Sequence, residues 1–249
     1  LFRANYISSD SLFFITSQPA FRRKKLDQSL SQFSISYRQN IATYKRLIMQ
    51  KNKLLKTNED VVLVKNINQL LAPLIFEIQK ERLMYLKDIE LLINDFIQKF
   101  KFPVKKLQII YHSKLNLTFQ KDDIINYLNR QLPKERLSRM SLYGPHRDDF
   151  MFTTDGRLIK EFYSRGVCRT ISYFFQLSQA QITKNKTDLP MLLLLDEPFS
   201  EIYRDLKFDL IRLIPSSFFK IYTSTQQDEI TSLKDTLLYA IKKGVLCKL

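Results

Sequence analysis

Apolar residues recur with the 3.6-residue period of amphipathic helices through most of residues 1–140. This pattern predicts a first helix that starts at Pro19. Four more helices are predicted over 35–56, 61–100, 122–132 and 133–140. Pro73 lies inside the longest of them, and we expect it to kink or divide that helix because proline cannot donate a backbone hydrogen bond. The first part of the chain is therefore predicted to be mainly helical.

Shorter apolar runs predict strands. In chain order they lie at 2–7, 12–15, 107–111, 115–119, 141–143, 149–153, 158–162, 191–195, 218–222 and 237–241. The runs at 191–195 and 218–222 are continuous, which is typical of strands buried on both faces of a parallel sheet. Helices predicted over 167–183 and 203–213, and a third after residue 222, alternate with these strands, so the second part has the order of a doubly wound α/β sheet. We accordingly predict two lobes, a helical one over 1–140 and an α/β one over 141–249.

Two acids, Asp196 and Glu197, follow the apolar run that begins at Met191. Ligands of open α/β sheets bind at the carboxyl ends of strands, so both side chains are expected at a functional edge. An apolar strand ending in Asp matches the Walker B pattern that holds Mg²⁺ on a bound nucleotide, and the next acid is placed to orient or deprotonate an attacking water. The alternative is a buried strand that ends in a polar turn.

Ser164, Arg165 and Gly166 precede the helix predicted over 167–183. A serine and an accessible glycine at a helix N-terminus can bind an anion through free backbone amides and the helix dipole. The alternative for Ser164 is an ordinary N-cap. The order of Ser-x-Gly, helix, apolar strand, Asp-Glu and then Ser200-Glu201 is that of ABC-type ATPases, from the signature motif through Walker B to the D-loop.

Charge is unevenly divided along the chain, whose net charge is +15. Residues 1–140 contain 25 Lys and Arg against 12 Asp and Glu, whereas residues 141–249 contain 15 against 13. A uniform lysine excess, as AT-rich coding produces, does not explain this bias, and a one-sided basic surface suits nucleic acid. The candidate DNA contacts are Arg22, Arg23, Lys24, Lys45, Arg46 and Lys51.

Several classes of protein fit the composition poorly. Two cysteines and two histidines provide neither a disulfide framework nor a metal-ligand cluster. We find no signal-peptide pattern and no apolar run as long as a membrane span, which favours a cytoplasmic protein without a membrane role. Only four glycines occur, and none belongs to a G-x-x-x-x-G-K-[ST] phosphate-binding loop.

The heptapeptide Gly144-Pro145-His146-Arg147-Asp148-Asp149-Phe150 is the most specific motif. It matches a motif of the RecF family of bacterial DNA replication and repair proteins, which are ABC-type ATPases related to SMC head domains. The chain also resembles this family at Pro19, Arg22, Arg23, Leu26, Asp27, Tyr44 and in the segment 50–56, where Lys51 replaces an arginine. The resemblance covers essentially all 249 residues, and the family's P-loop segment falls upstream of Leu1.

The resemblance implies a partial ABC-type P-loop NTPase head of the α/β class with a mainly helical second lobe. It implies that Asp196 binds Mg²⁺ through water, that Glu197 polarises the hydrolytic water and that Thr225 lies near the γ-phosphate of ATP. The signature Ser164, Arg165 and Gly166 would close on the ATP of a second subunit in an ATP-dependent homodimer. Family membership further implies binding to single-stranded and gapped DNA, cooperation with RecO and RecR, and recombination mediation in DNA repair and the SOS response.

Two departures weaken the case for efficient hydrolysis. Val167 replaces the Gln that usually follows the signature glycine, and Tyr203 stands where the D-loop usually carries Asp. Without a P-loop we predict no ATPase activity for residues 1–249 alone. The alternative function is a non-catalytic DNA-binding or partner-docking remnant of a RecF-type protein. A transporter's nucleotide-binding domain is disfavoured by the heptapeptide and the basic lobe.

Overall fold

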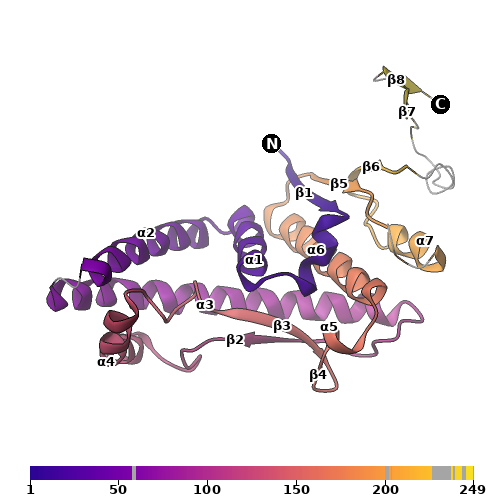
Figure 1. Cartoon of the computed structure of the whole chain (residues 1–249). Helices are drawn as coiled ribbons and strands as arrows, with labels where there is room; N and C mark the ends of the chain where they lie inside the picture. Colours follow the sequence, from indigo (N-terminus) through magenta and orange to yellow (C-terminus); the bar gives the residue numbers. More distant parts are fainter. Residues whose placement is uncertain are drawn as a thin grey trace.

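The fold is known from a computed structural model, which describes residues 1–57, 60–199, 202, 204–225, 237, 239–242 and 245–248. Figure 1 shows helices at one end of the molecule, most strands towards the other end, and one long helix that runs along both. The mixed helix and sheet content agrees with the predicted α/β class.

Four helices dominate the first part: α1 (Pro19–Phe33), α2 (Ile35–Thr57), α3 (Val61–Gln98) and α4 (Lys121–Ser138). The predicted helical regions are thus confirmed, but Pro73 does not divide α3, and α4 runs through Pro133 as one helix rather than two. Leu71, Ala72 and Ile75 are all fully buried around Pro73. Their packing holds the helix together where the missing backbone bond alone favours a break.

Three parallel strands, β1 (Arg3–Ser8), β5 (Met191–Asp196) and β6 (Phe219–Thr223), form a sheet in the order β1-β5-β6. Helix α6 (Arg165–Thr187) packs against this sheet, and Met191, Leu193 and Leu195 are buried. The prediction that both strands are buried on both faces is wrong, because Phe219 is 67% exposed and Ile221 is 55% exposed. Only one face of the described sheet is covered.

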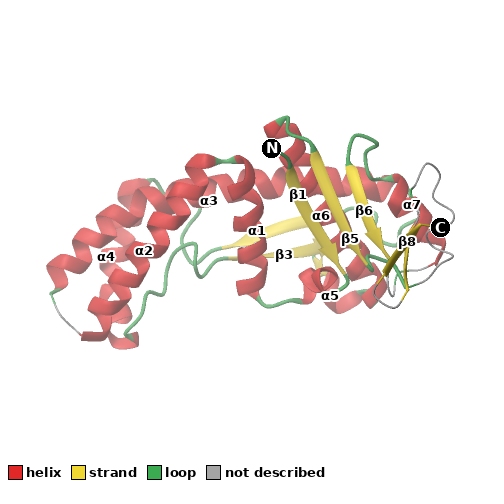
Figure 2. Ribbon diagram, turned by 90° about the horizontal axis from the view of Figure 1, so that it is seen from above, coloured by secondary structure: helices red, strands yellow, loops and turns green. Residues whose placement is uncertain are grey.

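The uncovered face is apolar. Strand pairing places Ala4 beside Leu192, Tyr6 beside Leu194, and these leucines beside Phe219 and Ile221. Paired residues point to the same side of a sheet, so all six side chains share this face. Asp196 and its partner Thr223 follow in the same alternation, which places the end of this face next to the predicted catalytic edge (Figure 2).

A second, antiparallel sheet contains β2 (Gln108–His112), β3 (Asp149–Thr154) and β4 (Arg157–Leu158), in that order. Several predicted strands are wrong. Residues 115–119 and 141–143 form no strand, residues 12–15 lie in the 3₁₀ helix η1 (Asp10–Thr16), and most of 158–162 forms helix α5 (Ile159–Phe162). Short apolar runs do not distinguish a strand from a buried turn or helix, because their period cannot be read.

The last part contains α7 (Arg204–Arg212) and the hairpin of β7 (Tyr239–Lys242) and β8 (Val245–Lys248). These confirm the predicted helix over 203–213 and a closing strand near 237–241. The helix predicted between the strands at 222 and 237 lies outside the described residues. The hairpin stands apart from the remaining described elements in Figure 1.

Both sheets combine strands from either side of residue 140. Strand β1 pairs with β5, and β2 pairs with β3. Phe14 of η1 packs against Phe150, Phe152 and Phe175, with ring centroids 4.4–6.0 Å apart. The division of the chain into lobes at residue 140 therefore stays a prediction. The two parts contribute strands to the same two sheets and side chains to one aromatic core.

Helix α3 is long and apolar enough to cross a membrane by length and composition alone, contrary to our expectation that no such run exists. One helix of this kind is weak evidence, since core helices of globular proteins have the same character. Here α3 packs against α2, α4 and α6 and contains the buried polar residues Asn68, Gln79 and Arg82. Its contacts are those of a core helix.

Candidate functional site

Asp196 lies at the carboxyl end of β5, where it accepts two side-chain hydrogen bonds. Thr223 donates its hydroxyl to Oδ1 at 2.6 Å, and Tyr6 donates its phenol to Oδ2 at 2.8 Å. These bonds, first that from Thr223 and then that from Tyr6, lower the pKa of Asp196. The hydrogen bond to Asp196 in turn raises the pKa of Tyr6. The carboxylate is thus ionised and fixed in orientation by its two neighbouring strands.

Glu197 occupies a tight turn immediately after Asp196. Its φ angle is +46°, in the left-handed region that non-glycine residues seldom adopt. Its backbone amide donates to the carbonyl of Thr223 at 3.1 Å, and its Oε1 accepts a hydrogen bond from the amide of Thr225. The fold therefore brings Asp196, Glu197 and Thr225 together at one edge, as a functional site at this position requires.

Ser164 is the N-cap of α6, and its hydroxyl accepts a hydrogen bond from the amide of Val167. Ser164 and Arg165 are exposed, and Gly166 is half-buried. The first amides of a helix have no partner within it, so this terminus retains the chemistry of an anion site. Among the described residues no hydrogen bond joins Ser164 to Asp196 or Glu197, which leaves the signature segment separate from the carboxylates of its own chain.

We call the carboxyl end of β5, with Asp196 and Glu197, the acidic edge. Its chemistry suits Mg²⁺ held through water. Asp196, Glu197, Tyr6 and Thr223 offer oxygen atoms only, and hard cations prefer oxygen ligands. Within the described residues, no group of three or more His, Cys, Asp or Glu side chains could hold a metal by itself. Mg²⁺ retains several waters in most nucleotide sites, so one carboxylate suffices for the predicted contact.

The heptapeptide starts with a glycine that no other residue can replace without strain. Gly144 has φ +120°, and a Cβ built there would lie 2.6 Å from the hydroxyl oxygen of Tyr44. His146 contacts the same hydroxyl through Nδ1, while its Nε2 lies 3.1 Å from the carbonyl oxygen of Ser141. A carbonyl can only accept, so Nε2 carries the proton and Nδ1 accepts from Tyr44.

The centre of the motif contacts a buried arginine of α3. Arg82 donates to the carbonyl of Pro145 at 2.8 Å and pairs with Asp27 of α1 at 2.7 Å. Its guanidinium also donates to the hydroxyls of Tyr37 at 3.0 Å and Tyr111 at 3.3 Å. Burial raises the pKa of both tyrosines, which keeps them protonated as donors. One arginine thereby joins α1, α2, α3, β2 and the heptapeptide.

Both aspartates of the motif are also engaged. Asp148 is 1% exposed, and its Oδ2 accepts from Gln79 and Tyr111, each at 2.7 Å. Asp149 pairs with Arg22 through two bonds of 2.9 and 2.7 Å. Arg23 donates to the backbone carbonyl of Asp148 at 2.7 Å. The heptapeptide therefore works as a structural junction, and we call it, with Asp27, Tyr37, Tyr44, Arg82 and Tyr111, the polar junction.

Two of the predicted DNA contacts are corrected by burial. Arg22 is 5% exposed and paired with Asp149, and Lys51 is 0% exposed and paired with Glu135 at 2.6 Å. Neither cation can reach a phosphate. Arg23 is half-buried at the polar junction, whereas Lys24, Lys45 and Arg46 are exposed.

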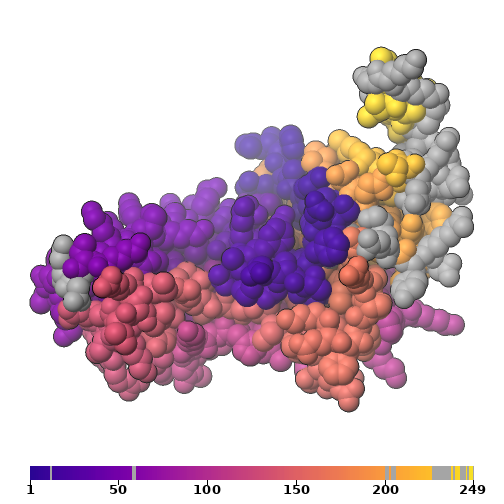
Figure 3. Space-filling model, viewed as in Figure 1, coloured from indigo at the N-terminus to yellow at the C-terminus, as the bar shows by residue number. Residues whose placement is uncertain are grey.

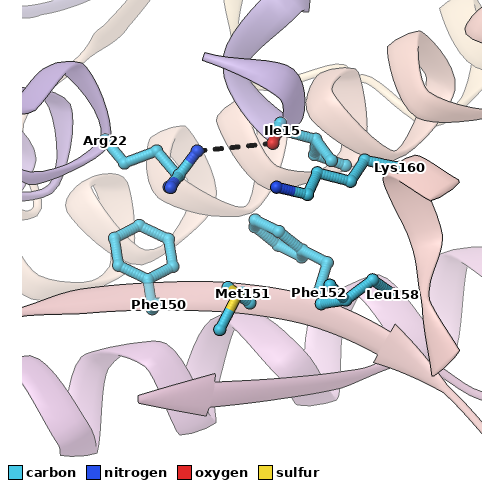
Figure 4. A pocket seen from close by; sticks show the side chains of 7 residues that line it. All are labelled: Ile15, Arg22, Phe150, Met151, Phe152, Leu158 and Lys160. Carbon is cyan, nitrogen blue, oxygen red and sulfur yellow. Dashed lines mark hydrogen bonds between the residues drawn. The ribbon is translucent and has the colours of Figure 1, made fainter. Parts of the chain in front are cut away.

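A small pocket lies beside the polar junction, between α1, η1 and β3 (Figure 4). Ile15, Phe150, Phe152 and Leu158 contribute apolar walls, and Arg22 and Lys160 contribute cations. Its cavity volume of about 10 Å³ is that of a single water. Arg22 here donates to the carbonyl of Ile15 at 3.5 Å. A space of this size is far below that of a ligand pocket, so it carries no ligand site.

The half-buried His146 predicts a pH-dependent stability. Burial lowers its pKa from 6.5 to about 4. The folded state therefore favours the neutral ring. The stability that this preference adds is fully present above pH 6.5 and is lost as the pH falls toward 4. The free energy of unfolding should drop by up to about 3 kcal/mol across this window. Urea titrations at several pH values test this, since H146Q should flatten the dependence and H112Q, at an exposed position, should not.

Comparison with known proteins extends over nearly the whole chain. The DNA replication and repair protein RecF of Macrococcus caseolyticus is 27% identical over an alignment of 249 residues, gaps included. The alignment covers 94% of this chain and 67% of that protein. RecF of a Staphylococcus aureus strain is 25% identical over 252 residues, covering 96% and 68%. The structure of the recombination mediator protein RecF-ATP in the RecFOR pathway superposes with a TM-score of 0.85 at 25% identity, over 100% of this chain and 68% of that one. The chain is RecF-like.

A second RecF structure, RecF-ATPrS, superposes with a TM-score of 0.84 at the same identity and coverage. No protein-family model matches the chain. The RecF likeness confirms the predicted fold class, a partial ABC-type α/β head with a mainly helical second lobe.

The sequence did not indicate every residue of the RecF-like acidic edge. Tyr6 and Thr223 hold Asp196 but were not predicted to do so. Thr223 could have been predicted, because it directly follows the strand predicted over 218–222 and ligands bind at the carboxyl ends of strands. Tyr6 gave no signal, since its contact spans 190 residues of sequence. Ser200, Glu201 and Tyr203, the predicted D-loop, lie outside the described residues.

Proposed function

We propose that the chain is part of a RecF-like protein that binds ATP and Mg²⁺ and engages DNA during replication, recombination and repair. The observation that supports this most strongly is the acidic edge. Asp196 and Glu197 are set side by side at the end of a parallel strand, and Tyr6 and Thr223 hold Asp196. A RecF-ATP structure superposes over 100% of this chain with a TM-score of 0.85.

In this proposal each site residue has its own role. Asp196 would hold a bound Mg²⁺ through water, and the ion would supply positive charge that neutralises the phosphates. Glu197 would accept a proton from the attacking water. The amide of Thr225, bonded to Glu197, fixes the base in place. The N-terminus of α6, with Ser164, Arg165 and Gly166, offers amides to the γ-phosphate held by a second subunit, which makes ATP the link of a homodimer.

A second candidate is a non-catalytic DNA-binding or partner-docking protein. It is favoured by the buried Val167 next to the signature glycine. In either case we propose single-stranded and gapped DNA, RecO and RecR as partners, an involvement in the SOS response, and a cytoplasmic location. We expect residues 1–249 alone to show no ATPase activity.

The test is ATP binding by the full protein encoded by the gene, measured with Mg²⁺ and with EDTA. The D196N variant should bind Mg-ATP at least tenfold more weakly, about 1.4 kcal/mol, with little change in EDTA. D188N is the matched control, because Asp188 caps the far end of α6 in a left-handed conformation that Asn tolerates. Equal binding by D196N and the parent would contradict the proposed site. DNA binding without any nucleotide effect would favour the second candidate.

A further inference from the structure

An exposed aromatic ring lies beside the signature segment. Phe162 ends the short helix α5 and is 59% exposed. It comes two residues before Ser164, the N-cap of α6. In Figure 3 the salmon-coloured segment that includes α5 forms part of the lower right surface. A single exposed ring is common on protein surfaces, so its neighbours and its fixed position decide what it can do.

One face of this ring is covered by a cation. The guanidinium carbon of Arg157, an exposed residue of β4, lies 5.1 Å from the ring centroid of Phe162. Guanidinium groups stack on aromatic faces in this way. A ring has two faces, so the exposed part of Phe162 can accept a second planar group. A nucleotide base is such a group, and bases stack on aromatic side chains whatever their identity.

The ring is held in a fixed position relative to the N-terminus of α6. Ile159 anchors α5 in the core at 0% exposure, and the amide of Tyr163 donates to its carbonyl at 3.0 Å. The thiol of Cys168, in the first turn of α6, contacts the carbonyls of Ile159 and Tyr163, each at 4.0 Å. Helix α5 is thereby attached to α6, and Phe162 keeps its place beside the signature amides.

The spacing places the ring to one side of the anion site rather than over it. Tyr163 and Ser164 have extended backbones, with ψ angles of 154° and 162°. Two extended residues span about 7 Å. When a terminal phosphate lies at Ser164, the ring is therefore displaced from it, on the side where the rest of the nucleotide can lie.

We propose that Phe162 stacks on the base of the ATP that a second copy of the chain holds and whose γ-phosphate meets Ser164. This rests on the proposed function and makes it more specific, because the signature side of the homodimer then contacts the base as well as the phosphate. Stacking accepts any base, so the contact distinguishes a nucleotide from a free phosphate without selecting adenine.

The experiment measures ATP-dependent dimerisation of the full protein encoded by the gene, by analytical ultracentrifugation with Mg²⁺. F162L keeps an apolar side chain but removes the ring, and it should need about 5- to 150-fold more ATP for half-maximal dimerisation. F162W keeps a planar ring and should dimerise like the parent. A second readout is 2-aminopurine riboside triphosphate, whose fluorescence is quenched by stacking. Dimerisation with this nucleotide should quench it in the parent and in F162W but not in F162L.

F21L is the matched control. Phe21 of α1 is also exposed, at 36%, and also has a cation over its ring, with Lys25 Nζ 5.6 Å from the centroid. It lies away from the signature segment in sequence and on another helix, so F21L should dimerise and quench like the parent. Equal unfolding midpoints show that all variants remain folded.

Four results would overturn the inference. Two are dimerisation of F162L at the parent's ATP concentration and a parent dimer that leaves the 2-aminopurine fluorescence unchanged. Equal loss of dimerisation in F162L and F162W would make the ring a contact between protein surfaces instead. A parent that binds Mg-ATP but stays monomeric would overturn both this inference and the homodimer of the proposed function, whereas the D196N test of nucleotide binding is independent of it.

Discussion

R82M is expected to lower the free energy of unfolding by about 3–5 kcal/mol. Arg82 is 1% exposed, and its guanidinium donates to Asp27, Tyr37, Tyr111 and the carbonyl of Pro145. Methionine fills much of the space but leaves the buried carboxylate of Asp27 without its cation. It also removes the guanidinium donor from three acceptors, the hydroxyls of Tyr37 and Tyr111 and the carbonyl of Pro145. Urea unfolding followed by circular dichroism measures the loss.

K87M is the control for this variant. Lys87 lies on the same helix but is exposed, so its replacement should change stability by less than about 0.5 kcal/mol. A loss below 1 kcal/mol in R82M would contradict the assignment of the polar junction as a structural element. The heptapeptide would then require another role, because its contacts would contribute little to folding.

The buried pair of Lys51 and Glu135 should give an equally large effect with a different signature. K51M leaves the carboxylate of Glu135, which is 0% exposed, without its partner and should destabilise the fold by about 3–5 kcal/mol. Burial also lowers the pKa of Lys51, so the ammonium depends on Glu135 to remain charged. The double variant K51M/E135L removes both charges and should recover most of the stability.

Comparison with K53M separates burial from helix position in that experiment. Lys53 is exposed on the same helix two residues further on, and K53M should unfold like the parent. If K51M instead left stability unchanged while weakening DNA binding, Lys51 would be a surface contact after all. Unfolding curves of the two single variants and the double variant therefore test the correction made by the structure.

The sequence was most informative where local pattern determines structure. The strand at 191–195, its terminal Asp196 and the helix after Ser164 were all predicted, since each depends on a few adjacent residues. Burial of Lys51 was also accessible, because Tyr37, Tyr44 and Lys51 follow one another at seven-residue spacing on the inner side of α2. The prediction of Lys51 as a DNA contact gave its charge more weight than its position on the helix.

The polar junction could not be predicted in the same way. Its members are the heptapeptide 144–150 and the distant residues Asp27, Tyr37, Tyr44, Arg82 and Tyr111, and only the tertiary fold brings them together. The same holds for the uncovered face of the parallel sheet. An apolar run indicates that at least one face of a strand is buried, but it does not show whether protein covers both faces.

That uncovered face has a consequence for self-association. Within the described residues, Tyr6, Phe219 and Ile221 expose apolar surface on β1 and β6, the outer strands of the three-stranded sheet. An exposed apolar patch next to open strand edges favours aggregation. We therefore expect residues 1–249 alone to self-associate through this sheet at high concentration, whatever the repulsion between their positive charges.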